Sequence, residues 1–343
     1  MNSSTTFTRT FPFSAILGQD HMKLALLLNV IDPKIGGVLL SGYQGTGKST
    51  AVRSLVDILP EISVHEGCQF QCDITWVEER CDFCRDHTAK VISKPITLVN
   101  LPLGATEEMV IGSLDIEKII REGKRAILPG LLAKAHRGIL YIDEINLLQD
   151  HLVDILLDVS ASGINIIERE GISLSHPSAF ILVGSMNPEE GDLRPQISDR
   201  LGLEVPITAP NDAKIRSEIT RRVIKFQDHP EEFCDAFSSQ QTQVKHQIMQ
   251  ARENLLQIAI PSDLYNKIAG FTIDLGFYSQ RTDLTFLRCA RAIAAWNRSP
   301  QILFEDTRQA MHLVFEHRVK RFQENLSMDE LEAKFTQHFT HEA

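Results

Sequence analysis

A glycine-rich segment of this 343-residue chain has the residue types and the spacing of a phosphate-binding loop. In such a loop the glycines let backbone N–H groups turn toward phosphate oxygens, the lysine places a cation beside the β- and γ-phosphates, and the hydroxyl that follows is a ligand for Mg²⁺. The pattern G-x-x-x-x-G-K-[ST] is complete and predicts a site for ATP and Mg²⁺. The predicted contact residues are Gly42, Tyr43, Gln44, Gly45, Thr46, Gly47, Lys48, Ser49 and Thr50, with Ser49 as the magnesium ligand.

Two apolar runs end in polar side chains that could complete a nucleotide site. Asp143 and Glu144 follow the run 139–142, and we expect Asp143 to hold Mg²⁺ through water and Glu144 to orient and polarise the attacking water. Asn187 ends the run that begins at residue 179. It would lie near the γ-phosphate if the two strands are neighbours, because ligands of open α/β sheets gather at the carboxyl edge. The alternative is an ordinary surface Asp-Glu pair, with Asn187 as a turn residue before Pro188.

Four of the six cysteines, Cys68, Cys72, Cys81 and Cys84, lie in one segment as C-x3-C and C-x2-C. Four thiolates so close in sequence could surround a tetrahedral Zn²⁺. The alternative is that only Cys81 and Cys84 form a pair, redox-active or inert. Six cysteines in a chain of this length do not make the disulfide framework of a secreted protein.

The elements that must position these residues change in character near residue 210. Before it, short apolar runs alternate with amphipathic stretches, which predicts a parallel sheet covered by helices on both faces. The strand candidates are 37–41, 96–99, 138–142 and 179–183, and a helical stretch over 48–59 follows the glycine-rich loop. We also expect a helix from Thr106 towards Arg121, and a β-hairpin over 164–176 turned at Glu170-Gly171.

Beyond residue 210 the periodic stretches are helical, so the predicted fold class is α/β followed by a smaller all-α domain. The predicted domains are 1–210, which binds nucleotide and carries a cysteine-rich insert at 65–90, and 211–343, which forms a helical lid. The helices expected in the second domain are 212–226, 244–258, 263–275, 283–296 and 305–322, with Asp283 and Asp306 at N-cap positions.

Composition narrows the class of protein. Lys and Arg number 35 against 45 Asp and Glu, and the resulting net charge of −10 argues against binding along an extended nucleic acid. A hydrophobic fraction of 43% is that of a folded globular chain. The apolar runs fall far below the roughly 18 residues of a membrane span, and the Ser/Thr-rich N-terminus lacks the apolar core of a secretory signal. We therefore expect a cytoplasmic protein with no membrane span and no nucleic-acid partner.

These landmarks, in this order and followed by a helical domain, resemble an AAA+ ATPase with hairpin insertions. Further motifs are similar to those of the ATPase I subunit of magnesium chelatase, and the resemblance covers nearly the whole chain, more strongly before about residue 205 than after it. The motifs are FPF at 11–13 with ILGQ at 16–19, NVIDP at 29–33, LPLGATE at 101–107, PGLLA at 129–133, DEINLL at 143–148 and NPEEGDLRPQ at 187–196.

The resemblance implies a ring of subunits, a hexamer, in which an arginine of one subunit completes the ATP site of its neighbour. Arg200 matches that finger, with Arg194 as its rival. Arg281 fits the sensor 2 arginine of the second domain, with Arg288 as the alternative. The implied partners are a D subunit with a related ATPase region and an H subunit that carries the porphyrin.

The implied activity is ATP-driven insertion of Mg²⁺ into protoporphyrin IX, a metal–porphyrin ligase reaction of chlorophyll or bacteriochlorophyll biosynthesis. The implied compartment is the bacterial cytoplasm, or the chloroplast stroma if the chain is plastid-encoded. Several alternatives stay open at this point: a cobalt-chelatase-type ATPase, a MoxR-like chaperone that remodels a partner complex, a DNA or RNA translocase, and a nucleotide-gated scaffold without turnover.

Overall fold

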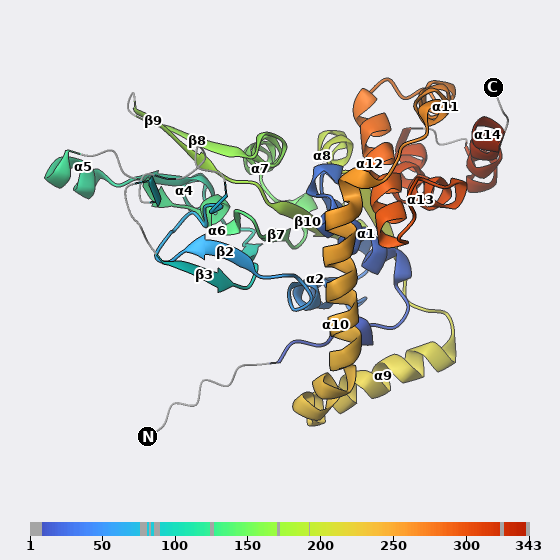
Figure 1. The fold of residues 1–343 in the computed structure, drawn as a ribbon, viewed down its shortest axis with the longest axis horizontal. Coiled ribbons are helices and arrows are strands. Elements are labelled where there is room, and N and C mark those ends of the chain that lie inside the picture. Colours follow the sequence, from blue (N-terminus) through green and yellow to red (C-terminus); the bar gives the residue numbers. More distant parts are fainter. Residues whose placement is uncertain are drawn as a thin grey trace.

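The computed structural model describes residues 9–75, 81, 84–85, 90–123, 127–169, 172–191, 193–322 and 326–340. Figure 1 shows an α/β part on the left and a helical part, coloured yellow to red, on the right and below. The long helix α10 (Pro230–Asn254) belongs to the helical part and lies where that part meets the α/β part. The predicted order, α/β first and all-α second, is confirmed. Among the described helices, none is long and apolar enough to cross a membrane.

A five-stranded parallel sheet organises the first part, with the strand order β11-β1-β10-β7-β4. The strands are short and mostly buried, as expected for a sheet covered on both faces. The predicted strands are confirmed with end shifts of up to three residues. β10 lies between β1 and β7, so the ends of these three strands meet at one edge of the sheet. The strands are β1 (Val38–Gly42), β4 (Leu98–Leu101), β7 (Ile139–Ile142), β10 (Ile181–Met186) and β11 (Leu203–Ile207).

The sheet separates two hydrophobic cores, because successive side chains of a strand point to opposite faces. Leu39, Leu140 and Leu182 face one core, which α4, α6, α7 and α8 complete. Leu40 and Val183 face the other core, which α1, α2 and most helices of the second part complete. The helices of the first part are α1 (Asp20–Ile31), α2 (Lys48–Val56), α4 (Glu107–Ile111), α5 (Ile116–Glu122), α6 (Leu131–Ala135), α7 (Asp150–Ser162) and α8 (Pro195–Arg200), with short 3₁₀ turns η1 (Phe13–Ala15), η2 (Pro33–Ile35), η3 (Ile145–Leu147) and η4 (Pro188–Glu190).

In the described part of the chain, three two-stranded antiparallel sheets accompany the main sheet. They pair β2 (Ile62–His65) with β3 (Val91–Lys94), β5 (Gly112–Leu114) with β6 (Ile127–Pro129), and β8 (Ile164–Arg169) with β9 (Ile172–Pro177). The predicted hairpin is therefore confirmed, while its turn at 170–171 lies outside the described residues. The hairpin and α5 project from the same side of the α/β part (Figure 1).

The single helix predicted from Thr106 towards Arg121 is wrong, because β5 separates α4 from α5. Gly112 explains the break. Its φ of +93° lies outside the helical region, and a Cβ atom there would lie 2.5 Å from the carbonyl oxygen of Leu128 on the partner strand. The glycine therefore lets β6 approach, and the chain pairs as a strand instead of continuing the helix.

The second part contains six helices among the described residues: α9 (Ala213–Asp228), α10, α11 (Ser262–Asp274), α12 (Gln280–Trp296), α13 (Phe304–Phe322) and α14 (Met328–Thr340), with the 3₁₀ turn η5 (Leu255–Gln257) after α10. The N-cap predictions are wrong, since α12 and α13 begin before Asp283 and Asp306. Ser279 caps α12 by accepting a hydrogen bond from Arg281 N at 3.3 Å. Asp306 acts from inside the first turn of α13, where its carboxylate accepts from Leu303 N at 2.9 Å.

The second part packs against the amino-terminal ends of β1 and β11. Arg318 on α13 is buried and donates to the carbonyl oxygens of Leu201 and Gly202, at 3.0 and 3.2 Å, directly before β11. Arg288 on α12 donates to the carbonyl oxygen of Lys34, which precedes β1. In parallel strands these ends lie opposite the carboxyl ends, so the helical part contacts the sheet at the edge away from the glycine-rich loop.

Candidate active site

The carboxyl ends of β1, β7 and β10 enclose a cavity of about 370 Å³. Its walls come from the glycine-rich loop, from the two acids after β7 and from the end of β10. The position agrees with the rule that open α/β sheets bind ligands at this edge. The lining residues are Gln44, Gly45, Thr46, Gly47, Lys48, Ser49, Thr50, Asp143, Glu144, Ser185, Met186 and Asn187. The predicted neighbours of the phosphate loop are thus brought together.

The glycine-rich loop has the backbone shape that a phosphate cradle requires. Gly45 and Gly47 have φ values of +77° and +86°, which residues with a side chain rarely adopt. Apart from the adjacent residues, no described atom lies within 4 Å of a Cβ built at either position. The loop is therefore open on the side where these glycines stand, and α2 begins directly after Gly47. Backbone N–H groups at a helix N-terminus attract anions, so this loop fits a polyphosphate group.

Lys48 lies at the floor of the cavity and is 9% exposed. Its Nζ donates to the carbonyl oxygens of Gly42 and Tyr43, the latter at 3.0 Å. Burial lowers the pKa of Lys48, and the nearby carboxylates of Asp143, Glu190 and Glu144 oppose that change. A cation held on loop carbonyls among carboxylates can move onto phosphate oxygens without leaving the site.

A hydrogen-bonded group of hydroxyls joins the loop to the acid after β7. Tyr141 donates to Asp143 Oδ1 at 2.9 Å, its Oη lies 3.0 Å from Ser49 Oγ, and Ser185 also donates to Asp143. Ser185 Oγ in turn accepts from Glu144 N at 3.2 Å. Both residues predicted to bind magnesium, Ser49 and Asp143, therefore share one hydrogen-bond network.

Glu144 and Asn187 are held by local backbone geometry. Glu144 is a non-glycine residue with φ 56° and ψ 53°, a conformation that costs free energy and is frequent at functional sites. Asn187 accepts from Glu189 N at 3.2 Å, and its Nδ2 donates to Glu190 Oε1 at 3.3 Å. Glu190 Oε1 also accepts from Gln44 Nε2 at 3.1 Å, so the turn after β10 is tied to the loop.

Three polar residues of the site did not emerge from the sequence: Tyr141, Ser185 and Glu190. A signal was present for the first two. Tyr141 precedes Asp143 by two residues and Ser185 precedes Asn187 by two, and residues i and i+2 of a strand share a face. Glu190 carries no comparable signal, because its place depends on the turn η4.

The predicted arginines do not line this cavity within the described part of the chain. Arg200 ends α8 and pairs with Asp158, whereas Arg194 precedes α8, pairs with Asp150 and donates to the carbonyl oxygen of Leu148 at 3.2 Å. Both side chains are partly exposed, 37% and 36%. Arg281 is exposed in the first turn of α12, and Arg288 contacts the opposite end of β1. Their predicted roles in ATP hydrolysis stay predictions.

The four predicted cysteines form a second candidate site. The four Sγ atoms all lie within 4.8 Å of one another, and Cys72 and Cys84 are buried. Cys68 Sγ and Cys81 Sγ are 3.8 Å apart, and Cys81 N donates to Cys72 Sγ at 3.3 Å. None of the four forms a disulfide. This cluster could bind a metal ion, since four sulfurs at such distances can surround one ion.

Comparison with known proteins gives consistent matches. A family model described as "Magnesium chelatase, subunit ChlI" matches residues 12–200, and one described as "AAA lid domain" matches residues 266–336. The chain is 51% identical over 315 residues to the "Magnesium-chelatase subunit ChlI homolog" of Methanocaldococcus jannaschii, across 91% of this chain and 86% of that protein. It is 48% identical over 326 residues to the chloroplastic magnesium-chelatase subunit ChlI-2 of Arabidopsis thaliana, across 94% of this chain and 78% of that protein.

Solved structures include a similar chain. It comes from a complex between subunits BchI and BchD of magnesium chelatase, built from a single-particle cryo-EM reconstruction. The TM-score is 0.56 at 44% sequence identity, and the match covers 95% of this chain and 99% of that one.

Proposed function

This chain belongs to the magnesium chelatase subunit ChlI family and is the ATPase subunit of that enzyme, and we propose that its cavity hydrolyses ATP to drive insertion of Mg²⁺ into protoporphyrin IX. The observation that carries the proposal is the convergence of Lys48, Ser49, Asp143, Glu144 and Asn187 on one cavity at the sheet edge. Free energy from ATP hydrolysis is needed because Mg²⁺ must lose water ligands to enter the porphyrin and does so reluctantly.

Each side chain has a role that its position supports. The loop amides and Lys48 hold the phosphates, and Ser49 and Asp143 hold the magnesium that accompanies ATP. That ion neutralises charge on the phosphate oxygens when bound. Glu144, fixed by its backbone, orients and polarises the water, and Asn187 contacts the γ-phosphate end of the cavity. Tyr141 and Ser185 keep Asp143 oriented.

A neighbouring subunit would complete the site. We infer a ring, a hexamer, in which Arg200 reaches the ATP of the adjacent subunit, with Arg194 as the rival. Arg281 is the sensor 2 candidate, with Arg288 as the alternative. The finger role is supported by two observations: within the described part of the chain Arg200 and Arg194 do not line the cavity of their own subunit, and both are partly exposed, as a finger supplied in trans must be.

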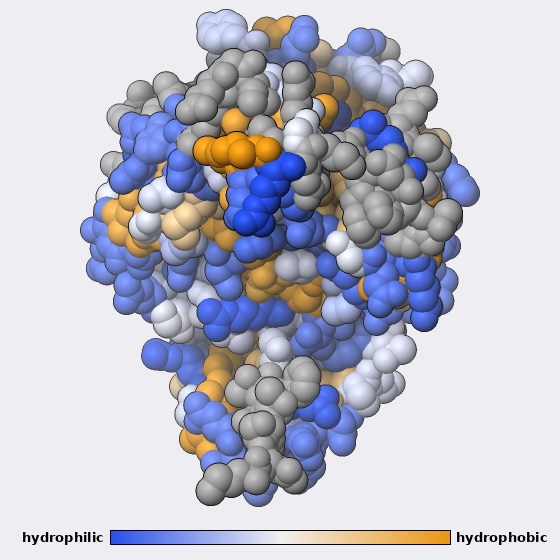
Figure 2. Space-filling view, turned by 90° about the vertical axis from the view of Figure 1, so that its left-hand side faces the viewer, coloured by the Kyte–Doolittle hydropathy of each residue, from blue (hydrophilic) through white to orange (hydrophobic). Residues whose placement is uncertain are grey.

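The partners follow from the same proposal: a D subunit, as in the BchI–BchD complex, and an H subunit that carries the porphyrin. The projecting hairpin and α5 support a contact on that side. Figure 2 faces this side and shows hydrophobic side chains among hydrophilic ones. Ile116 and Ile120 of α5 are 58% and 78% exposed, and Ile164 and Ile166 of the hairpin strand β8 are 49% and 56% exposed. We place the protein in the cytoplasm, or in the chloroplast stroma of a plant, where the Arabidopsis relative is named as chloroplastic.

We also propose that Cys68, Cys72, Cys81 and Cys84 hold a structural Zn²⁺. A site of four protein ligands has no open position for substrate, so the ion would act on folding and not on chelation. Protein purified under reducing conditions should carry about one zinc per chain by elemental analysis. Protein with no metal would contradict this role and leave the pairing of Cys81 with Cys84.

The function is tested by reconstitution with H and D subunits, protoporphyrin IX and ATP. We expect fluorescence of the magnesium porphyrin with Mg²⁺, none without ATP, and none with Glu144→Gln. Insertion of Co²⁺ in place of Mg²⁺ would indicate a cobalt chelatase. ATP turnover without insertion of either ion would indicate an ATPase that remodels a partner complex.

A further inference from the structure

We propose that Arg137 is the positioning residue of the four-cysteine metal site, which it braces against the turn that leads into β7. This inference rests on the proposed metal role of the cysteines. Arg137 lies between α6 and β7 in sequence, far from Cys72, yet its guanidinium contacts the main chain on both sides of that ligand. It touches no sulfur in the contacts that define the brace, so it would act through the ligand loop.

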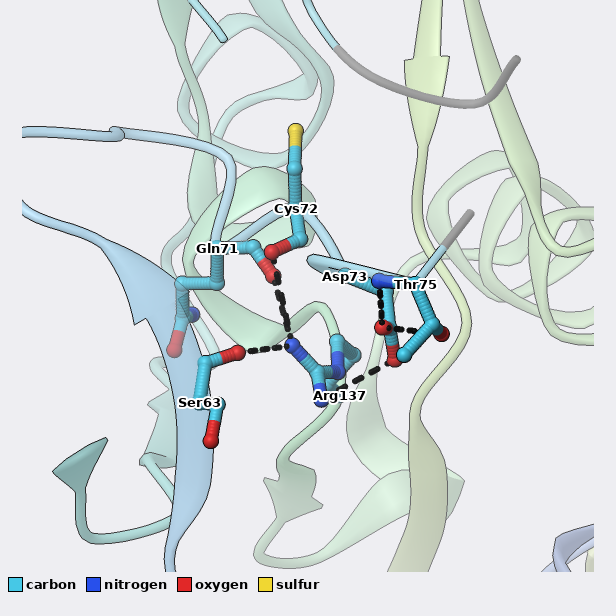
Figure 3. Close-up of polar contacts among 6 residues, drawn as sticks. All are labelled: Ser63, Gln71, Cys72, Asp73, Thr75 and Arg137. Atoms are coloured by element: carbon cyan, nitrogen blue, oxygen red, sulfur yellow. Dashed lines mark hydrogen bonds and ion pairs between the residues drawn. The ribbon is translucent and has the colours of Figure 1, made fainter. Parts of the chain in front are cut away.

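The brace consists of four contacts from one guanidinium group (Figure 3). Nη1 donates to the carbonyl oxygens of Ser63 at 2.9 Å and of Gln71 and Cys72 at 3.4 Å each. Nη2 pairs with Asp73 Oδ2 at 3.1 Å. Figure 3 shows that the sulfur of Cys72 points away from Arg137 while its carbonyl oxygen points toward it. Cys72 therefore contributes its sulfur to the cluster and its carbonyl oxygen to the contact with Arg137.

Both ends of the brace are fixed. Arg137 has φ 58°, and its own N–H donates to the carbonyl oxygen of Ala179 at 2.7 Å. On the other side, Gln71 is buried with φ 51°, and its Nε2 donates to the carbonyl oxygen of Lys134 at 2.6 Å. Asp73 is oriented by Thr75, whose N–H and hydroxyl donate to it at 2.8 and 2.6 Å. The ligand loop is thus held in one geometry against α6 and β7.

Charge and shape explain why an arginine stands here. Four thiolates outweigh the charge of a divalent ion, so the loaded cluster would be anionic, and a nearby cation lowers its free energy. A planar guanidinium can donate to carbonyl oxygens and a carboxylate at once, which a lysine ammonium cannot do in this geometry. Partners that orient metal ligands typically contribute about 10- to 100-fold to metal affinity.

The test is the Zn²⁺ dissociation constant of the full chain, measured by competition with a chromophoric chelator. We expect Arg137→Ala to weaken binding about 10- to 100-fold, and Arg137→Lys and Asp73→Asn to weaken it by less. Arg121→Ala is the matched control, because it also replaces an arginine and removes an ion pair, here with Glu117 on the surface of α5. It should bind zinc as the unchanged chain does. Replacement of zinc by Co²⁺ should give the absorption bands of a tetrahedral thiolate site, broadened or shifted in Arg137→Ala.

The outcomes separate the two proposals. A chain without zinc, and without a cobalt spectrum, overturns the metal role itself. A chain that binds zinc equally well with Arg137 or with alanine there overturns the brace and leaves the metal role standing. If Arg137→Ala does not fold, Arg137→Lys and Asp73→Asn decide: unchanged zinc affinity and unchanged cobalt bands in both would contradict the brace.

Discussion

Tyr141 Oη lies 3.0 Å from Ser49 Oγ, and this contact joins the phosphate-binding loop to the strand that ends at Asp143. Tyr141 donates its own proton to Asp143, so Ser49 is left to donate to the tyrosine oxygen. The two predicted magnesium ligands are therefore held by one buried phenol. Burial raises the pKa of Tyr141, which keeps the phenol protonated and able to donate at neutral pH.

Removing that hydroxyl should weaken the response to magnesium more than it slows the chemical step. We expect Tyr141→Phe to raise the Mg²⁺ concentration needed for half-maximal ATPase activity about 10-fold, because partners that orient metal ligands contribute to affinity on that scale. The maximal rate at saturating Mg²⁺ should change by much less. The measurement is ATPase rate against free Mg²⁺ at fixed saturating ATP.

Tyr265→Phe is the control, since Tyr265 lies on α11 and is 51% exposed. It should leave the magnesium dependence unchanged. An equal fall of rate at every Mg²⁺ concentration in Tyr141→Phe would contradict a positioning role and place the phenol in the chemical step or in folding.

The site could be predicted from the sequence where one short segment sets both the structure and the chemistry. The glycine-rich loop, Lys48 and Ser49 follow a buried strand directly, and Asp143 ends another, so local pattern was sufficient. The roles of Tyr141 and Ser185 depend on β7 lying beside β10, which local pattern does not give. Their spacing of two residues before Asp143 and Asn187 was the available signal.

The fold shows the same division. Helices α9, α11, α12 and α13 were predictable, whereas α14 and residues 230–243 of α10 lay outside the predicted ranges. The segment α4–β5–α5 was not predictable either, because Gly112 ends the helix only where β6 approaches. The docking of the helical part depends on Arg318 reaching carbonyl oxygens 116 and 117 residues away in sequence. Such contacts are specified by tertiary packing, which local sequence patterns do not give.

Substitutions of Lys48 and Glu144 should separate ATP binding from turnover. Lys48→Ala removes the cation that contacts the phosphates, so we expect loss of ATP binding and of hydrolysis together. Glu144→Gln keeps the shape of the site but cannot polarise the water, so binding should persist while kcat falls about 10²- to 10⁴-fold. Binding of a fluorescent ATP analogue and release of phosphate measure the two effects.

Glu168→Gln, at an exposed position of the hairpin strand β8, is the matched control and should change neither quantity. Loss of nucleotide binding in Glu144→Gln would show that this carboxylate holds the bound magnesium or the fold, and would remove its role toward water.

An arginine supplied by a neighbour predicts complementation between two inactive variants. The Lys48→Ala variant cannot hydrolyse ATP at its own site but still carries Arg200. The Arg200→Ala variant has an intact phosphate-binding loop but offers no arginine to its neighbour. Mixed in equal amounts in one ring, about one quarter of the interfaces combine an intact loop with an intact arginine finger, so activity should return to about that share of the unchanged chain. The measurement is ATPase rate against mixing ratio after subunit exchange.

The control mixture combines Arg200→Ala with the double variant Lys48→Ala/Arg200→Ala, which supplies no finger and should give no recovery. The same pair of mixtures with Arg194→Ala distinguishes the rival. A mixture of Lys48→Ala and Arg200→Ala that stays inactive, although the subunits exchange, would exclude Arg200 as the finger in trans.

The buried His317 on α13 should make the protein less stable in mild acid. Burial lowers the pKa of His317 well below its usual value, and the neighbouring cations Arg318, Arg321 and Lys320 lower it further. The unfolded chain, in which this histidine titrates near its usual pKa of about 6.5, therefore binds more protons than the folded chain below that pH, and the free energy of unfolding falls as the pH falls. One unit below, near pH 5.5, the loss is about 1.4 kcal/mol from this group. Urea unfolding at about pH 8 and about pH 5.5 measures this loss of stability. His317→Asn cannot take up that proton, so its free energy of unfolding should fall by about this amount less between the two pH values. An equal pH dependence in both proteins would assign the acid sensitivity to other groups.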